Sequence, residues 1–149
     1  MQWKELCDFH QNSAYHVSLD KYASCNLVKY KNPLFRETPV KIRWTYYSYI
    51  VIIYLLRIMS IVALPVSFYY EMGDWWYGLF GWIISDYLYY ELRKIISEDL
   101  LSYSLSNEDY YQSLQNYADK ENKELFSVQK KSQMKPTPWY KKIVEIFFK

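Results

Sequence analysis

The sequence predicts an all-α membrane protein: a two-span antiparallel transmembrane helical hairpin with an extended N-terminal arm and an amphipathic C-terminal helix. Three observations predict this fold class. Apolar residues make up 51% of the 149 residues, and they are concentrated in two runs near the middle of the chain. Aromatic residues flank both runs, as they do at membrane interfaces. A very short connection separates the two runs, so the chain has to turn back on itself there.

The first apolar run is long enough to cross a bilayer. Residues 50–66 read IVIIYLLRIMSIVALPV, with Arg57 as the only charge, and at about 1.5 Å per residue they span roughly 25 Å. Because a bilayer core is about 30 Å thick, the run and its aromatic flanks predict a first span over residues 44–70. The run is apolar around its whole circumference, which disfavours a buried helix of a small soluble domain.

The second apolar run follows at once. Residues 75–90 read WWYGLFGWIISDYLYY, with Asp86 as the only charge, and with their flanks they predict a second span over residues 74–94. The short connection makes the two spans antiparallel neighbours, so residues 44–94 are predicted to form the transmembrane hairpin. Basic residues before and after this hairpin place both termini on the cytoplasmic or matrix side, by the positive-inside rule.

Small residues recur at helical spacing in both predicted spans, which predicts close packing between them. If the hairpin turns near residue 72, these residues lie opposite one another at every level. The small residues are Ser60, Ala63 and Ser67 in the first span and Gly78, Gly81 and Ser85 in the second, paired as Ser67 with Gly78, Ala63 with Gly81 and Ser60 with Ser85.

The same helical spacing, with a turn near residue 72, places Arg57 and Asp86 at nearly the same depth and on the same side of the hairpin. Ionisable residues inside a membrane are functional candidates by default, and opposite signs at one level indicate an ion pair. We expect an intramembrane pair that neutralises itself and sets the helix register. The alternatives are that either charge bonds to a helix of another subunit, or that the pair lies on a proton or ion path.

Residues 1–43 form a polar N-terminal arm without the apolar core of a secretory signal. Pro33 and Pro39 each disfavour helical conformation in the preceding residue, so residues 32–40 are expected to be extended and to lead to the membrane.

Four potential metal ligands lie in the N-terminal arm without forming a zinc motif. Cys7 and His10 have the spacing of one ligand pair, but His16 and Cys25 do not form a second pair. A disulfide between the two cysteines is disfavoured in a reducing compartment. We therefore expect free cysteines and no metal or cofactor, structural lipids apart.

Residues 95–149 form a polar C-terminal arm. Ser106 as a cap and Asp109 three residues later, followed by apolar residues at helical spacing, predict an amphipathic helix over residues 107–130. The end of the chain, residues 139–148, is an apolar tail that is expected to bind a groove on a partner protein or, alternatively, to lie on the membrane interface. The expected anchor residues of this tail are Trp139, Tyr140, Ile143, Ile146, Phe147 and Phe148.

Several function classes are excluded by composition and by motif. A net charge of +2 gives no broad basic field for nucleic acid. The sequence has no phosphate loop, dinucleotide-binding turn or nucleophile elbow, so neither enzymatic activity nor a small-molecule substrate is expected.

The sequence therefore favours a non-catalytic accessory or structural subunit of a large multi-subunit inner-membrane complex. Its expected partners are membrane lipid and other subunits, because both arms are rich in aromatic residues like surfaces that bury against protein. Abundant Tyr and the excess of Lys over Arg favour the mitochondrial inner membrane and the respiratory chain, since accessory subunits encoded by AT-rich genomes share this composition. Alternatives are a bacterial inner-membrane immunity or membrane-perturbing effector protein, and a membrane assembly factor.

Overall fold

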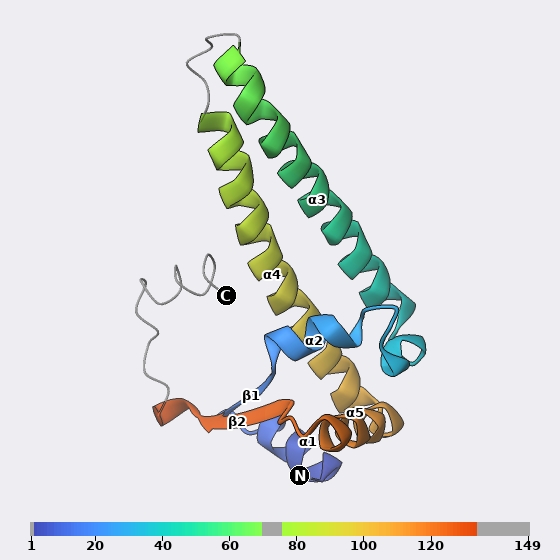
Figure 1. Ribbon diagram of the computed structural model, residues 1–149. Coiled ribbons are helices and arrows are strands. Elements are labelled where there is room, and N and C mark those ends of the chain that lie inside the picture. Colours follow the sequence, from blue (N-terminus) through green and yellow to red (C-terminus); the bar gives the residue numbers. More distant parts are fainter. Residues whose placement is uncertain (1, 70–75, 134–149) are drawn as a thin grey trace. The chain divides into compact units, whose positions relative to one another are not determined.

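The computed structural model describes residues 2–69 and 76–133, apart from the side chains of Phe68, Tyr77 and Gln133. Within these residues the chain is mostly helical with one small sheet, as Figure 1 shows, so the prediction of a mainly helical chain is confirmed. The elements are the α-helices α1 (Trp3–Gln11), α2 (Lys21–Leu27), α3 (Val40–Tyr69), α4 (Trp76–Ser106) and α5 (Glu108–Glu121), the strands β1 (Tyr15–Leu19) and β2 (Phe126–Lys130), and the short 3-10 helices η1 (Pro33–Arg36) and η2 (Lys131–Gln133).

The chain divides into two compact units. Unit 1 consists of Met1–Trp44 and Arg93–Pro136, and unit 2 consists of Thr45–Leu92 and Thr137–Lys149. Helix α3 begins in unit 1 and continues through unit 2, and α4 passes from unit 2 into unit 1. Segments from both predicted polar arms thus belong to a single unit.

The N-terminal arm is folded, and the prediction of an extended arm over residues 1–43 is wrong. It contains α1, β1, α2 and η1. Asp20 begins α2, because its side-chain Oδ1 accepts a hydrogen bond of 2.7 Å from the backbone N–H of Ala23. Residues 32–40 contain η1 in place of the expected extended segment, since Pro33 stands at a helix start, where a missing backbone N–H costs nothing.

A two-stranded antiparallel sheet joins the two arms, and the all-α prediction is wrong at this point. Strand β1 pairs with β2 so that Val17 lies opposite Val128 and Leu19 lies opposite Phe126. The pairing joins segments that are separated by most of the sequence, and both strands lie within unit 1.

The amphipathic helix predicted over residues 107–130 ends earlier than expected. Helix α5 stops at Glu121, because Asn122 adopts the left-handed conformation with φ 51° and donates its backbone N–H to the carbonyl oxygen of Ala118. The start of the helix also differs: Asn107 is the cap, in place of Ser106, and its side-chain oxygen accepts from the next turn of the backbone.

The apolar core of unit 1 draws on the helices α1, α2, α4 and α5. Ile96 and Leu100, one turn apart on α4, have no exposed surface. Leu6 on α1, Leu27 on α2 and Leu114 on α5 are likewise fully buried. Burial of each such side chain stabilises the fold by about 1.5–3 kcal/mol, so these five leucine and isoleucine residues are a principal source of stability.

Helix α4 is longer than the second predicted span, which was placed over residues 74–94. It has 31 residues and continues to Ser106. The reason is that buried apolar residues recur every four positions, at Leu92, Ile96 and Leu100, so the helix continues past the apolar run into the core of unit 1. Helix α3, with 30 residues, begins at Val40, four positions before the predicted start.

Helix α3 is the one helix among the described residues that is long and apolar enough, over Val40–Ser67, to cross a membrane. Only 11% of its apolar window is buried within the chain. Ile58 and Met59, for example, expose 57% and 67% of their surface. These features are weak evidence, by length and composition, of a membrane association.

Candidate functional site

Helices α3 and α4 pack closely where α4 carries glycines. A Cβ atom added at Gly78 would lie 2.6 Å from Cγ of Leu64 and 3.1 Å from the backbone oxygen of Ser60. A Cβ atom added at Gly81 would overlap the hydroxyl of Ser60. Close backbone approach at small residues supplies attraction between helices even in lipid, where the hydrophobic effect is absent.

The pairing register differs from the expected one by about one helical turn. Ser60 lies against Gly81, in place of the expected Ala63, and Leu64 lies against Gly78, in place of the expected Ser67. The prediction assumed a turn near residue 72. In an antiparallel pair, moving the turn by one residue changes which residue of α4 lies opposite a given residue of α3 by two positions. A small error in the assumed turn is therefore doubled in the register.

The serine hydroxyls of α3 bond within their own helix. Ser60 Oγ donates to the carbonyl oxygen of Leu56 at 2.7 Å, and Ser67 Oγ donates to that of Ala63 at 2.7 Å. Such bonds to the preceding turn satisfy the hydroxyl locally. These serines therefore act here as small packing residues and do not need a polar partner on α4.

The structure brings Arg57 of α3 and Asp86 of α4 together in an ion pair. Nη2 of Arg57 donates to Oδ1 of Asp86. Nε of the same guanidinium donates to Oγ of Ser85 at 3.2 Å, and this hydroxyl donates to the carbonyl oxygen of Trp82 at 2.7 Å. The guanidinium is thus held by two neighbouring side chains of α4, and Ser85, which is fully buried, lies at the ion pair and not opposite Ser60 as expected.

The ion pair is only partly covered by the two helices. The side chain of Arg57 is 34% exposed and that of Asp86 is 17% exposed. The guanidinium carbon of Arg57 lies 5.6 Å from the ring centroid of Trp82, within the range of a cation–π interaction. The sequence reasoning missed this contact, although Trp82 precedes Asp86 by four positions and therefore shares its helix face.

This arrangement suits structural pairing better than proton transfer. Arginine remains protonated in proteins, so Arg57 cannot pass a proton on. Apart from Arg57 and Asp86, residues 45–69 and 76–90 contain no charged side chain. A buried charge without its partner costs several kcal/mol, so each of the two residues makes the other tolerable between the helices.

The remaining predicted site residues divide into two groups. The tail anchors Trp139, Tyr140, Ile143, Ile146, Phe147 and Phe148 lie outside the described residues. Cys7 and Cys25 are both free thiols, and among the described residues no group of three or more His, Cys, Asp or Glu side chains could hold a metal ion. Burial raises the pKa of the Cys25 thiol to about 11, so this thiol stays protonated at neutral pH.

The fold and the site define a class of protein: a pair of long packed helices, one of them long and apolar enough to cross a membrane, joined to a small α+β unit. No family model, curated protein or solved structure matches this chain.

Proposed function

We propose that the chain is an integral membrane protein in which α3 and α4 form a two-span hairpin. The support from unit 2 is its apolar surface. Met59 on α3 and Phe80 on α4 expose 67% and 55% of their surface, and many other large apolar side chains of both helices are similarly exposed. Monomeric soluble proteins rarely expose contiguous apolar patches of more than a few hundred Å². A lipid environment would cover this surface.

The observation that carries the proposal is the pairing of β1 with β2. Strand β1 precedes α3 in the chain, and strand β2 follows α4. The two backbones are paired along their whole length, from Tyr15 opposite Lys130 to Leu19 opposite Phe126. Both strands must therefore lie on the same side of a membrane. A single crossing by α3 would separate them, so a crossing by α3 requires α4 to cross back. This argument supports the second span, for which length and hydropathy alone are insufficient.

The length of the apolar part of α4 is consistent with such a return. From Trp76 to Leu92, α4 rises about 24 Å, and a bilayer core of about 30 Å adapts to a short span at modest cost. The ion pair adds support, because Arg57 and Asp86 would lie deep in the hydrocarbon and satisfy one another there.

The function that these features support best is that of a non-catalytic accessory subunit of a multi-subunit inner-membrane complex. In this proposal the helix pair is an anchor, and unit 1 presents the surface for the other subunits on the cytoplasmic or matrix side of the membrane, where basic residues are favoured. The mitochondrial respiratory chain remains the favoured complex, on the composition of the chain. The self-neutralised ion pair supports an anchor over a conducting helix pair, since it leaves no series of charges along either helix.

Labelling with a membrane-impermeant thiol reagent tests the topology. Cys7 in the native chain, and a single cysteine introduced as Lys123→Cys in a Cys7→Ser background, should react from the same side of sealed vesicles. Lys123 is a suitable position because its side chain is 59% exposed. Buried Cys25 serves as the internal control that reacts only after unfolding. Reaction of the two sites from opposite sides would contradict the hairpin.

Native electrophoresis in mild detergent tests the accessory role. The protein should migrate within a particle of much greater mass than its own 18.3 kDa, and it should return to its own scale after strong detergent. Migration as a free protein under mild conditions would contradict the proposal. Ion conduction by the purified chain in liposomes would also contradict it and would favour the membrane-perturbing effector.

A further inference from the structure

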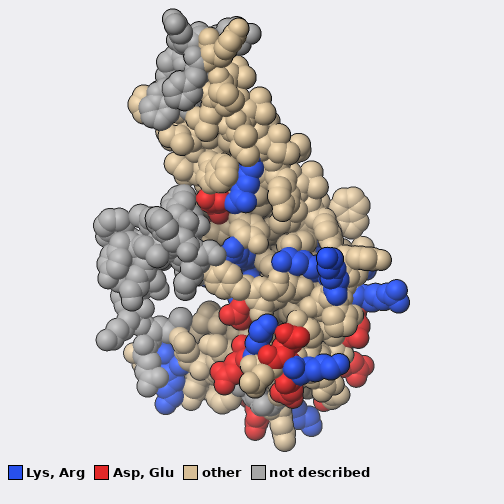
Figure 2. Space-filling model, in the orientation of Figure 1, with Lys and Arg blue, Asp and Glu red and all other residues tan. Residues whose placement is uncertain are grey.

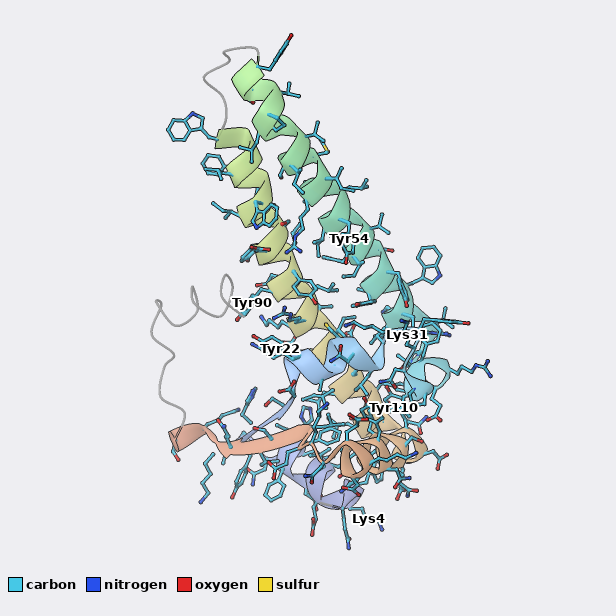
Figure 3. All side chains as sticks on the ribbon, viewed as in Figure 1. Lys4, Tyr22, Lys31, Tyr54, Tyr90 and Tyr110 are labelled. Carbon is cyan, nitrogen blue, oxygen red and sulfur yellow. The ribbon has the colours of Figure 1, made fainter. Side chains whose placement is uncertain are left out.

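Five of the basic residues of unit 1 lie in one segment next to and within the first turns of α3. Residues 29–44 contain five basic side chains and a single acid, Glu37. Figure 3 shows Lys31 beside the start of α3 and Lys4 at the opposite end of unit 1. Figure 2 shows many of the acidic side chains of unit 1 over its lower part, where α1 and α5 lie. The basic residues of the segment are Lys29, Lys31, Arg36, Lys41 and Arg43.

Most of these cations have no acidic partner within the described residues. The ion pairs of the described residues do not include Lys29, Lys31, Arg36 or Arg43. Lys29 donates to the side-chain oxygen of Asn26 at 2.8 Å, which leaves its charge uncompensated. The mutual repulsion of these cations is therefore not offset by described carboxylates, and an external layer of anions would offset it.

Aromatic residues lie between these cations in the sequence, as is typical of segments at a membrane interface. Trp44 is 71% exposed and Tyr30 is 78% exposed. The guanidinium carbon of Arg43 lies 4.6 Å from the ring centroid of Phe35, within the range of a cation–π interaction. Amphipathic rings beside Lys and Arg are typical of the headgroup level of a bilayer.

The position of the segment along α3 fits this level. Trp44 precedes Ile50, the first residue of the apolar run, by about 9 Å of helix. Headgroup regions extend about 5–7 Å beyond each face of the hydrocarbon core. Because the run 50–66 rises only about 25 Å, a hydrocarbon core of about 30 Å extends about 2–3 Å past Ile50 and leaves Trp44 about 6–7 Å beyond the core, at the depth of lipid phosphates.

We propose that residues 29–44 form a lipid-binding collar that binds the phosphate groups of anionic phospholipids. The inference rests on the proposed membrane crossing of α3 and goes beyond it by naming the lipid class and the residues. Lipid is favoured over an acidic protein surface because exposed Trp44 and Val40, the latter 60% exposed, require an apolar or interfacial environment beside the charges.

Native mass spectrometry of the full chain in neutral detergent tests this proposal. The probes are phosphatidylglycerol, phosphatidylcholine and inorganic phosphate. The test variant replaces Lys29, Lys31, Arg36 and Arg43 with Gln. The matched control replaces the same number of exposed cations elsewhere in unit 1, namely Lys4, Lys120, Lys123 and Lys131, with Gln.

The wild type and the control should bind phosphatidylglycerol in preference to phosphatidylcholine. The collar variant should bind phosphatidylglycerol on the order of 1000-fold more weakly, since each of the four basic residues near an anionic membrane surface contributes about 1 kcal/mol. Equal binding by the collar and control variants, equal binding of the two lipids, or equally tight binding of inorganic phosphate would overturn the proposal.

Resistance of the same proteins to alkaline carbonate extraction separates this inference from the proposed span. Wild type, collar variant and control should all remain in the membrane fraction, because the apolar helices supply insertion. Extraction of all three would mean that the span itself is wrong. Retention without lipid preference would overturn the collar alone.

Discussion

Gly81 on α4 faces the hydroxyl of Ser60 on α3 so closely that a side chain at position 81 would overlap it. Ser60 is 4% exposed, and its hydroxyl is fixed by the bond to Leu56. The next atom, Cβ of Ser60, would lie 3.5 Å from the added Cβ, which is an ordinary contact distance. The approach of the two helices is thus limited at this level by a single oxygen atom.

The first prediction follows from this contact. Gly81→Ala should destabilise the helix pair by about 1–3 kcal/mol through overpacking, measured by thermal unfolding in detergent. Ser60→Ala/Gly81→Ala should recover most of this loss, because the obstructing oxygen is gone. Ile83→Ala, at an exposed position of α4, is the control for a change of volume outside the contact. Additive losses in the double variant would show that the contact is not limiting.

The second prediction concerns the ion pair. Arg57→Leu or Asp86→Leu alone should cost about 3–5 kcal/mol, because each leaves an uncompensated charge between the helices. The double variant should cost less than either single variant. The measurement is a double-mutant cycle on unfolding in detergent. Equal losses in all three variants would mean that each charge bonds to a group other than its partner.

The third prediction concerns the buried contact between α5 and the segment before α3. Thr38 Oγ1 donates to the carbonyl oxygen of Leu34 at 3.0 Å and lies 3.2 Å from the hydroxyl of Tyr110, which therefore donates to Thr38. Thr38→Val should cost about 1–3 kcal/mol in urea unfolding, because it leaves the buried hydroxyl of Tyr110 without its partner, whereas the carbonyl oxygen of Leu34 still accepts from the backbone N–H groups of Glu37 and Thr38. In the Thr38→Val background, Tyr110→Phe should cost nothing further or restore stability. A large additional loss would place the main partner of Tyr110 elsewhere.

The fourth prediction concerns alkaline pH. Burial raises the pKa of the Cys25 thiol from its usual value of 9.0 to about 11, so the folded state holds this proton more tightly than the unfolded state. The contribution of the protonated Cys25 thiol to the free energy of unfolding is complete below pH 9 and is lost as the pH rises from 9 to 11. Urea unfolding should show this decline, and Cys25→Ala should reduce it. The decline in stability between pH 9 and 10 reports most clearly on Cys25. Above pH 10 the ionisation of Tyr110, whose pKa is raised to about 12 in the folded state, also lowers the stability.

Cys7→Ala is the matched control for the fourth prediction. Burial also raises the pKa of Cys7, but this side chain is only partly covered and its removal should leave most of the decline in place. An unchanged pH dependence in Cys25→Ala would assign the decline to other groups.

The two long helices could be predicted from the sequence because their signal is local. Apolar residues fill residues 50–66, and each run contains one charge, so the prediction that Arg57 and Asp86 approach one another needed only helix geometry and a turn. The register needed more. It depends on where the chain turns between the two helices, because a small error in the turning point is doubled in the pairing of residues such as Ser60 with Gly81.

The unit formed by the two arms could not be predicted in this way. Each arm is short and looks polar by itself, and the core appears only when Leu6, Leu27 and Leu114 are combined with the second half of α4. Likewise, residues 126–130 fall within the bounds of the predicted helix, but pairing with residues 15–19 makes them a strand. Contacts between distant segments overrode the local signals in both cases.

The same strand pairing sets an order of events during synthesis. Val17 leaves the ribosome early, and its partner Val128 emerges only after both long helices have been made. Loop closure over almost the whole chain is slow compared with helix formation, so unit 1 is the last part to complete. Until then β1 has no partner strand, and its backbone is accessible to chaperones and proteases. The finished sheet joins the segment that precedes α3 to the segment that follows α4.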